Sequence, residues 1–155
     1  MSAPVLVLCL GNAIRRDDAV ALRVADALER SGAEGATIRR SPASGLYLLD
    51  EMEGFDRVVV VDAIRTGARP PGAVLSFPLE DLHAPEGPSP HAIGLPSALA
   101  RARAAGAPVP SRVQVVAVEV ADMETIGEGL TPEVAAAVEP AAAAVREAVR
   151  ALGAA

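Results

Sequence analysis

The sequence predicts an α/β fold in which helices cover both faces of a mainly parallel sheet of about five strands, in three layers. Two observations indicate this class. Short apolar runs alternate with segments whose apolar residues recur at the spacing of a helix. The runs Val5–Leu10 and Val58–Val61 are apolar throughout, which is typical of strands buried on both faces. No linker or internal repeat divides the chain, so we expect one domain over residues 1–155.

The first half of the chain begins with a strand, a tight turn and a helix, and two further strands come after them. In order, we expect strand Val5–Leu10, a helix from Val20 to Ser31, strand Ala36–Arg40, helix Leu46–Met52 and strand Arg57–Asp62. The last of these strands is rich in β-branched residues. Such composition favours the centre of the sheet.

The second half begins at a loop rich in glycine and proline. We expect strand Ala73–Phe77 at an antiparallel edge, a surface segment over 78–90 with four prolines, a helix ending at Gly106, and strand Arg112–Val120. The final helix opens at Thr131-Pro132-Glu133, where a cap, a proline and an acid mark a helix start. Pro140 predicts a kink or a restart.

The composition excludes several classes of function. The net charge is −6, and the fourteen basic residues are all scattered arginines, so we expect no nucleic acid and no membrane as partner. Without lysine, neither a P-loop nor a Schiff-base enzyme is possible. One cysteine and two histidines cannot form an internal disulfide or a zinc finger. With no basic leader before the first apolar run, we expect a cytoplasmic protein.

Carboxylates lie where two of the expected strands end. Asp17 and Asp18 come after the first strand, and Asp62 ends the third. Because ligands of open α/β sheets bind at the carboxyl ends of parallel strands, we expect the three acids to face one crevice. A carboxylate that ends a buried strand needs water, a partner or a metal. Asp17 or Asp18 is alternatively a helix cap, a role that stabilises by about 0.5–2 kcal/mol.

A histidine joins two of these acids as a candidate ligand. His91 precedes the helix that ends at Gly106, so Asp18, Asp62 and His91 are the side chains best placed to meet above the sheet. Two carboxylates and an imidazole suit a divalent first-row metal ion. The alternative for His91 is a surface or capping role, and for His83 we expect only that role.

Other catalytic arrangements are missing from the sequence. It contains neither Gly-x-Ser-x-Gly nor His-Glu-x-x-His. Cys9 lies inside the first strand, where we expect it to be buried and inert. Gly11 lacks the partner glycines of a dinucleotide-binding loop. The acids therefore carry the chemistry.

Four motifs occur in order along nearly the whole chain. They are Leu10-Gly11-Asn12 with Arg16-Asp17-Asp18, Val61-Asp62-Ala63, Ser89-Pro90-His91-Ala92-Ile93-Gly94-Leu95, and Gly129-Leu130-Thr131-Pro132-Glu133-Val134. Together they resemble the endopeptidases that mature the large subunit of nickel-iron hydrogenases. The resemblance implies a cytoplasmic protease that removes a C-terminal extension from the hydrogenase large-subunit precursor once nickel has been inserted.

The resemblance also implies roles for individual residues. Asp18, Asp62 and His91 correspond to the metal-contacting residues of the family, and Asp17 is left as a helix cap. The nickel arrives in the substrate, and the three enzyme ligands complete its coordination. Either the metal polarises the carbonyl or activates water, or a carboxylate acts as general base. We favour Asp62 as the base, because an apolar setting raises the pKa of a carboxyl group.

The chain departs from the family pattern at several positions. Cys9, Ala19 and Ala21 stand where glycines are expected, and Arg40-Ser41-Pro42-Ala43 replaces an Asp-Gly-Gly-Thr-like loop that is expected to border the cleft. This loop motivates an alternative function, a non-cleaving nickel- or precursor-binding assembly factor of the same fold. A third hypothesis is another hydrolytic chemistry that uses the same acids.

Overall fold

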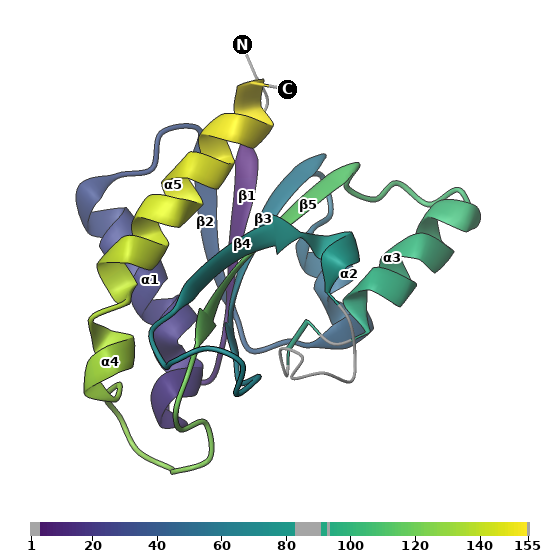
Figure 1. Ribbon diagram of the computed structural model, residues 1–155. Coiled ribbons are helices and arrows are strands. Elements are labelled where there is room, and N and C mark those ends of the chain that lie inside the picture. The colour runs from purple at the N-terminus through teal and green to yellow at the C-terminus, as the bar shows by residue number, and fades with distance from the viewer. Residues whose placement is uncertain (1–3, 83–90, 93, 155) are drawn as a thin grey trace.

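The structure is a computed structural model that describes residues 4–82, 91–92 and 94–154. It confirms the expected three-layer fold with a central sheet (Figure 1). The strands are β1 (Val5–Leu10), β2 (Ala36–Ser41), β3 (Arg57–Ile64), β4 (Val74–Pro78) and β5 (Arg112–Glu119). Their order in the sheet is β2-β1-β3-β5-β4, so β3 lies at the centre as predicted. All neighbours pair in parallel except β4, which forms the expected antiparallel edge on β5.

Helices lie on both faces of the sheet (Figure 1). The α-helices are α1 (Val20–Ser31), α2 (Leu48–Glu51), α3 (Leu95–Ala104), α4 (Pro132–Ala135) and α5 (Val138–Ala154). Short 3-10 helices are η1 (Arg16–Ala19), η2 (Gly45–Tyr47) and η3 (Leu79–Asp81). Helices α1 and α5 pack together on one face, and α2 and α3 cover the other. Within the described ranges, no helix has both the length and the apolarity needed to cross a bilayer.

Alternation along the strands divides the interior into two apolar cores. In β1, Val5, Val7 and Cys9 belong to the core under α1 and α5, whereas the intervening leucines belong to the core under α2 and α3. All residues of β1 are buried, as expected for a strand covered on both faces. Cys9 is fully buried, as predicted, and burial raises the pKa of its thiol to about 12, a value typical of an inert cysteine.

The sequence-based end of β3 is too early. Asp62 does not end this strand, because pairing with β5 continues from Asp62 opposite Ala117 to Ile64 opposite Glu119. Asp62 therefore lies within the sheet, on the face that α2 and α3 cover. Tertiary pairing with a long neighbouring strand extends β3 past a residue that by itself disfavours strand structure.

Two other segments differ in detail from the sequence-based expectation. In the segment expected over 78–90, Pro78 is the last residue of β4, and η3 follows it with Leu79 buried in the core under α2 and α3. Residues 83–90 and 93 lie outside the described residues, so the predictions for His83 and for this part of the third motif stay predictions. The final helix restarts rather than kinks: α4 and α5 are separate, and Pro140 lies in the first turn of α5, where its missing N–H costs little.

The parallel strands place the carboxyl ends of β1 and β3 on one edge of the sheet, the lower edge in Figure 1. The turn after β1 and the segment between β5 and α4 meet there: the Gly127 amide donates to the Ile14 carbonyl at 2.7 Å. The loop after β2 joins the same edge through its Gly45 amide, which donates to the His91 carbonyl at 2.9 Å. Three loops distant in sequence thus converge where ligands of such sheets bind.

Candidate functional site

Asp18, Asp62 and His91 come together at this edge. Each offers one ligand atom, and these atoms lie within 4.8 Å of one another. Asp18 comes from η1 after β1, Asp62 from β3, and His91 from the turn before α3. The structure therefore brings together all three residues that the sequence proposed as metal ligands.

Asp18 is 4% exposed, and few groups contact its carboxylate. Its Oδ2 accepts a hydrogen bond from the backbone amide of Asn12 at 3.1 Å. His91 Nε2 lies 3.0 Å from Oδ1 and 3.2 Å from Oδ2. Gly11 makes the tight turn possible, since a Cβ at this position would lie 2.2 Å from the backbone oxygen of Asp18. Gly11 and Asn12 thus both support the position of Asp18.

Asp62 is fully buried and poorly satisfied. Its Oδ1 accepts a hydrogen bond from the Ala63 amide at 2.9 Å, whereas Oδ2 has no hydrogen-bond partner among the described residues. Burial raises the pKa of Asp62 well above its ordinary value, although the charge of His91 and the amide of Ala63 act in the opposite direction. A buried carboxylate oxygen without a partner is costly, and a cation at this position would relieve the cost.

His91 is held between the two acids. Burial favours its neutral form, but the hydrogen bond to Asp18 and the charges of Asp62 and Asp18 outweigh burial, so the pKa of His91 is raised. Its side chain is 12% exposed, so the imidazole lies between the buried acids and the surface. Two acids and an imidazole at this separation can share a proton or bind a metal ion.

Asp17 does not face this site, which corrects the expectation of three acids in one crevice. Its predicted role as a helix cap is also wrong, since the N-cap residues of η1 and α1 are Arg15 and Ala19, and neither makes a side-chain capping hydrogen bond. The carboxylate is fully buried and accepts hydrogen bonds from the amides of Ala121, Asp122 and Thr131. The local sequence of Asp17 favours capping of a helix, but its carboxylate is instead bound by a segment more than a hundred residues away in the chain.

Glu119 is a further buried carboxylate whose oxygens bind a loop. It accepts hydrogen bonds from the amide and hydroxyl of Thr66 and from the amide of Gly67. Asp17 and Glu119 are thus satisfied by backbone amides, whereas Asp18 and Asp62 keep oxygens that lie close to each other and to His91. This contrast separates the structural acids from the candidate functional ones.

A surface hollow of about 260 Å³ opens onto Asp18 and His91. It is lined by Asn12, Arg15, Asp18, Pro42, His91 and Met123. The loop that departs from the family pattern therefore borders the hollow through Pro42, as the sequence predicted. Its Arg40 instead bonds Asp26 and Glu29 of α1. Sequence reasoning did not identify Met123 as a wall residue, because no motif marks it.

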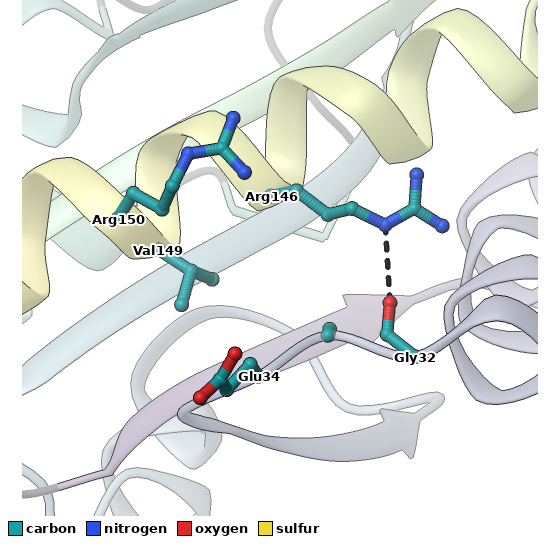
Figure 2. A pocket seen from close by; sticks show the side chains of 6 residues that line it. Gly32, Glu34, Arg146, Val149 and Arg150 are labelled. Atoms are coloured by element: carbon teal, nitrogen blue, oxygen red, sulfur yellow. Dashed lines mark hydrogen bonds between the residues drawn. The ribbon is translucent and has the colours of Figure 1, made fainter.

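A second hollow, of about 220 Å³, lies between α5 and the loop that precedes β2, at the edge of the sheet where the parallel strands begin. Figure 2 shows this hollow from close by. Arg146 of α5 reaches across it and donates from Nε to the Gly32 carbonyl at 3.1 Å, at the end of α1. A cation at the carboxyl end of a helix is a stabilising arrangement. Arg146 therefore has a structural explanation, and among the described residues the lining of this hollow includes no cluster of metal ligands.

Comparison with known proteins identifies the family of the chain. The family model described as hydrogenase maturation protease matches residues 22–148. The chain belongs to the hydrogenase maturation protease family. The Hydrogenase 2 maturation protease of Escherichia coli (strain K12) is 32% identical over 153 residues, which cover 96% of this chain and 92% of that protein. As a member of this family, the protein is a peptidase.

Solved structures of hydrogenase maturation proteases have the same fold. The hydrogenase maturating endopeptidase HybD from E. coli is 31% identical with a TM-score of 0.80, and the match covers 97% of this chain and 94% of that one. The [NiFe] hydrogenase maturation protease HybD from Thermococcus kodakarensis is 25% identical with a TM-score of 0.74, over 94% and 99% of the two chains. The family resemblance seen in the motifs thus extends to the whole fold.

Proposed function

We propose that this protein is the endopeptidase that removes the C-terminal extension of a nickel-iron hydrogenase large-subunit precursor after nickel insertion, in the cytoplasm. The family processes hydrogenase precursors, and this membership supports the reaction class. The observation that carries the proposal is the cluster of Asp18, Asp62 and His91 beside a surface hollow.

The nickel belongs to the substrate in this proposal. The precursor presents the metal at the hollow, and Asp18, Asp62 and His91 contact it and so place the scissile bond. Two features of the site fit a cation. The donor set of two carboxylates and one imidazole suits a divalent first-row metal, and Asp62 Oδ2 is buried without a hydrogen-bond partner among the described residues. Recognition of the metal would make cleavage depend on completed nickel insertion.

Asp62 is the proposed general base for the attacking water. Burial raises the pKa of its carboxyl group, and a raised pKa strengthens a carboxylate as a base at neutral pH. The alternative is that the nickel polarises the scissile carbonyl or activates the water, with Asp62 only as a ligand. The two routes differ for Asp62→Asn, because an amide oxygen still contacts a metal but does not accept the proton.

The test is mass spectrometry of a nickel-loaded large-subunit precursor incubated with the protein. We expect wild type to release a C-terminal peptide, and Asp18→Ala, Asp62→Ala and His91→Ala to release it far more slowly or not at all. Glu34→Ala is the matched control, since Glu34 is an exposed acid at the opposite edge of the sheet. This control variant should cleave at the wild-type rate.

A non-cleaving assembly factor is the competing function, and Pro42 in the wall of the hollow is the observation that favours it. Proline replaces a flexible glycine-rich loop in the family pattern, so the wall here is stiffer. An intact precursor that still binds wild type, and binds the three variants less tightly, would establish this factor in place of the protease. Complex formation is measured on the same samples by native mass spectrometry.

A further inference from the structure

The buried carboxylate of Asp17 joins two segments that meet at the candidate site. Its Oδ1 accepts hydrogen bonds from the Thr131 amide at 2.8 Å and the Thr131 hydroxyl at 3.0 Å. Its Oδ2 accepts from the amides of Ala121 and Asp122 at 3.0 and 2.9 Å. Hydrogen bonds to an ionised carboxylate are stronger than neutral ones. Both ends of the 121–131 segment are therefore bound to one side chain of the turn after β1.

The backbone of this turn is bound to the same segment. The Asp17 amide donates to the Asp122 carbonyl at 2.9 Å, and the Arg16 amide donates to the Gly127 carbonyl at 3.1 Å. Arg16 has a φ of 40°, the positive value that side chains disfavour, and it is the one non-glycine residue of this kind in the described ranges. Such a conformation persists only where its surroundings hold it. The hydrogen bonds of the adjacent Asp17 help to hold Arg16 in this conformation.

Asp18 has little other support. Among the described residues, its carboxylate contacts one backbone amide, that of Asn12, and His91, which is itself a candidate metal ligand. The position of the carboxylate therefore depends on the turn that carries it. Met123, in the wall of the hollow, belongs to the segment that Asp17 holds. The buried side chain of Asp17 thus connects the turn that carries Asp18 to the segment that carries Met123.

We propose that Asp17 is a positioning residue, which holds the turn of Asp18 against the 121–131 segment and so keeps Asp18 at the distance from His91 and Asp62 that the reaction needs. This inference rests on the proposed function for its effect on cleavage. The expected effect of Asp17 on the geometry of the site does not depend on the proposed function. Misplacement of a reacting group by about 1 Å can cost about 100-fold in rate.

Glu119 offers a matched control for a purely structural role. It is also a buried carboxylate at this edge of the sheet, and it also binds a loop through backbone amides and a threonine hydroxyl. Its loop, around Thr66 and Gly67, contributes no residue to the described lining of the hollow. Glu119→Gln and Asp17→Asn therefore remove the same kind of interaction, one away from the site and one beside it.

The experiment compares Asp17→Asn, Glu119→Gln and wild type by melting temperature, by kcat and KM for precursor cleavage, and by crystal structure. We expect both variants to melt at lower temperature. Only Asp17→Asn should lose about 10- to 100-fold in kcat, with little change in KM, and should separate Asp18 from His91 beyond hydrogen-bond distance. Equal losses of kcat in the two variants, or an unchanged contact between Asp18 and His91 in Asp17→Asn, would overturn the proposal.

Thr131→Val keeps the test decisive if Asp17→Asn does not fold. It removes the hydroxyl that lies 3.0 and 2.8 Å from the two oxygens of Asp17 and leaves the three backbone amides in place. We expect a smaller loss of kcat of the same kind, about two- to tenfold. Failure of wild type to cleave would overturn the proposed function alone, since the crystal structures still report whether Asp17 positions Asp18.

Discussion

His91 Nε2 lies 3.0 and 3.2 Å from the two carboxylate oxygens of Asp18, and this contact joins loops that are 73 residues apart. Both residues line the hollow, and the fully buried Asp62 lies beside them. Each side chain of the pair helps to hold the other in place, so neither is positioned independently. Substitution of one should therefore impair the function of the other.

The first prediction is that Asp18→Ala and His91→Ala are not additive. Each should lower kcat/KM for precursor cleavage by more than about 100-fold, because removal of partners behind metal ligands already costs about 10- to 100-fold. The double variant should lose less than about tenfold further, since residues that act as a unit fail together. Kinetics of the four proteins measure this, and a double loss equal to the product of the single losses would contradict a shared site.

The second prediction concerns the pH dependence of stability. Burial raises the pKa of Asp62 above its ordinary 3.8, so the folded protein keeps a proton that the unfolded chain releases. The free energy of unfolding therefore falls as pH rises above about 4, until the folded pKa of Asp62 is passed, by at most about 1.4 kcal/mol per pH unit. The pKa of His91 is also raised, so its stabilisation is complete below 6.5 and is lost as pH rises through the folded value.

Asp62→Asn isolates the contribution of this one carboxyl group. The amide does not ionise, so the stability of the variant relative to wild type should grow with pH above about 4 and then reach a plateau. Urea unfolding between about pH 4.5 and 8.5 measures both proteins. Parallel curves would show that the folded and unfolded states bind the Asp62 proton equally. Cleavage by this variant should be abolished if Asp62 is the base.

The sequence predicts the part of the site that depends only on the direction of the strands. Val5–Leu10 and the run from Val58 to Val61 are apolar throughout, so both had to be central parallel strands, and parallel strands bring their carboxyl ends to one edge. That logic places Asp18 and Asp62 together without any knowledge of side-chain contacts. The place of His91 before a helix made it a candidate to join them, but a surface or capping role was also open to a single histidine there, and the family resemblance decided between the two.

The role of Asp17 could not be predicted for a physical reason. An acid at a helix start has a local explanation in capping, and nothing near it in sequence reveals the competing amides of Ala121, Asp122 and Thr131. The prediction for the end of β3 failed in the same way, since its last residues are held by β5. Both errors involve tertiary hydrogen bonds that replace a local preference.

The third prediction is that Cys9 takes no part in the reaction. The thiol is fully buried with a pKa of about 12, so native protein at about pH 8 should resist iodoacetamide, whereas protein in urea should gain one adduct. Intact mass measurement distinguishes the two. Cys9→Ala should cleave the precursor at the wild-type rate per folded molecule, with a loss of stability of about 1 kcal/mol from the missing sulfur. Loss of cleavage without loss of folding would contradict this.

The last prediction compares two glycines. A Cβ at Gly11 would lie 2.2 Å from the backbone oxygen of Asp18, which cannot yield without moving the turn that carries this acid. Gly11→Ala should therefore lower the free energy of unfolding by about 2 kcal/mol and should also lower the rate of cleavage. Gly153, in α5, has no atom within 4 Å of such a Cβ, so Gly153→Ala should stabilise the helix by up to about 1 kcal/mol and leave cleavage unchanged. Urea unfolding and cleavage assays on the same preparations measure both effects, and wild-type cleavage by Gly11→Ala would show that the turn tolerates displacement.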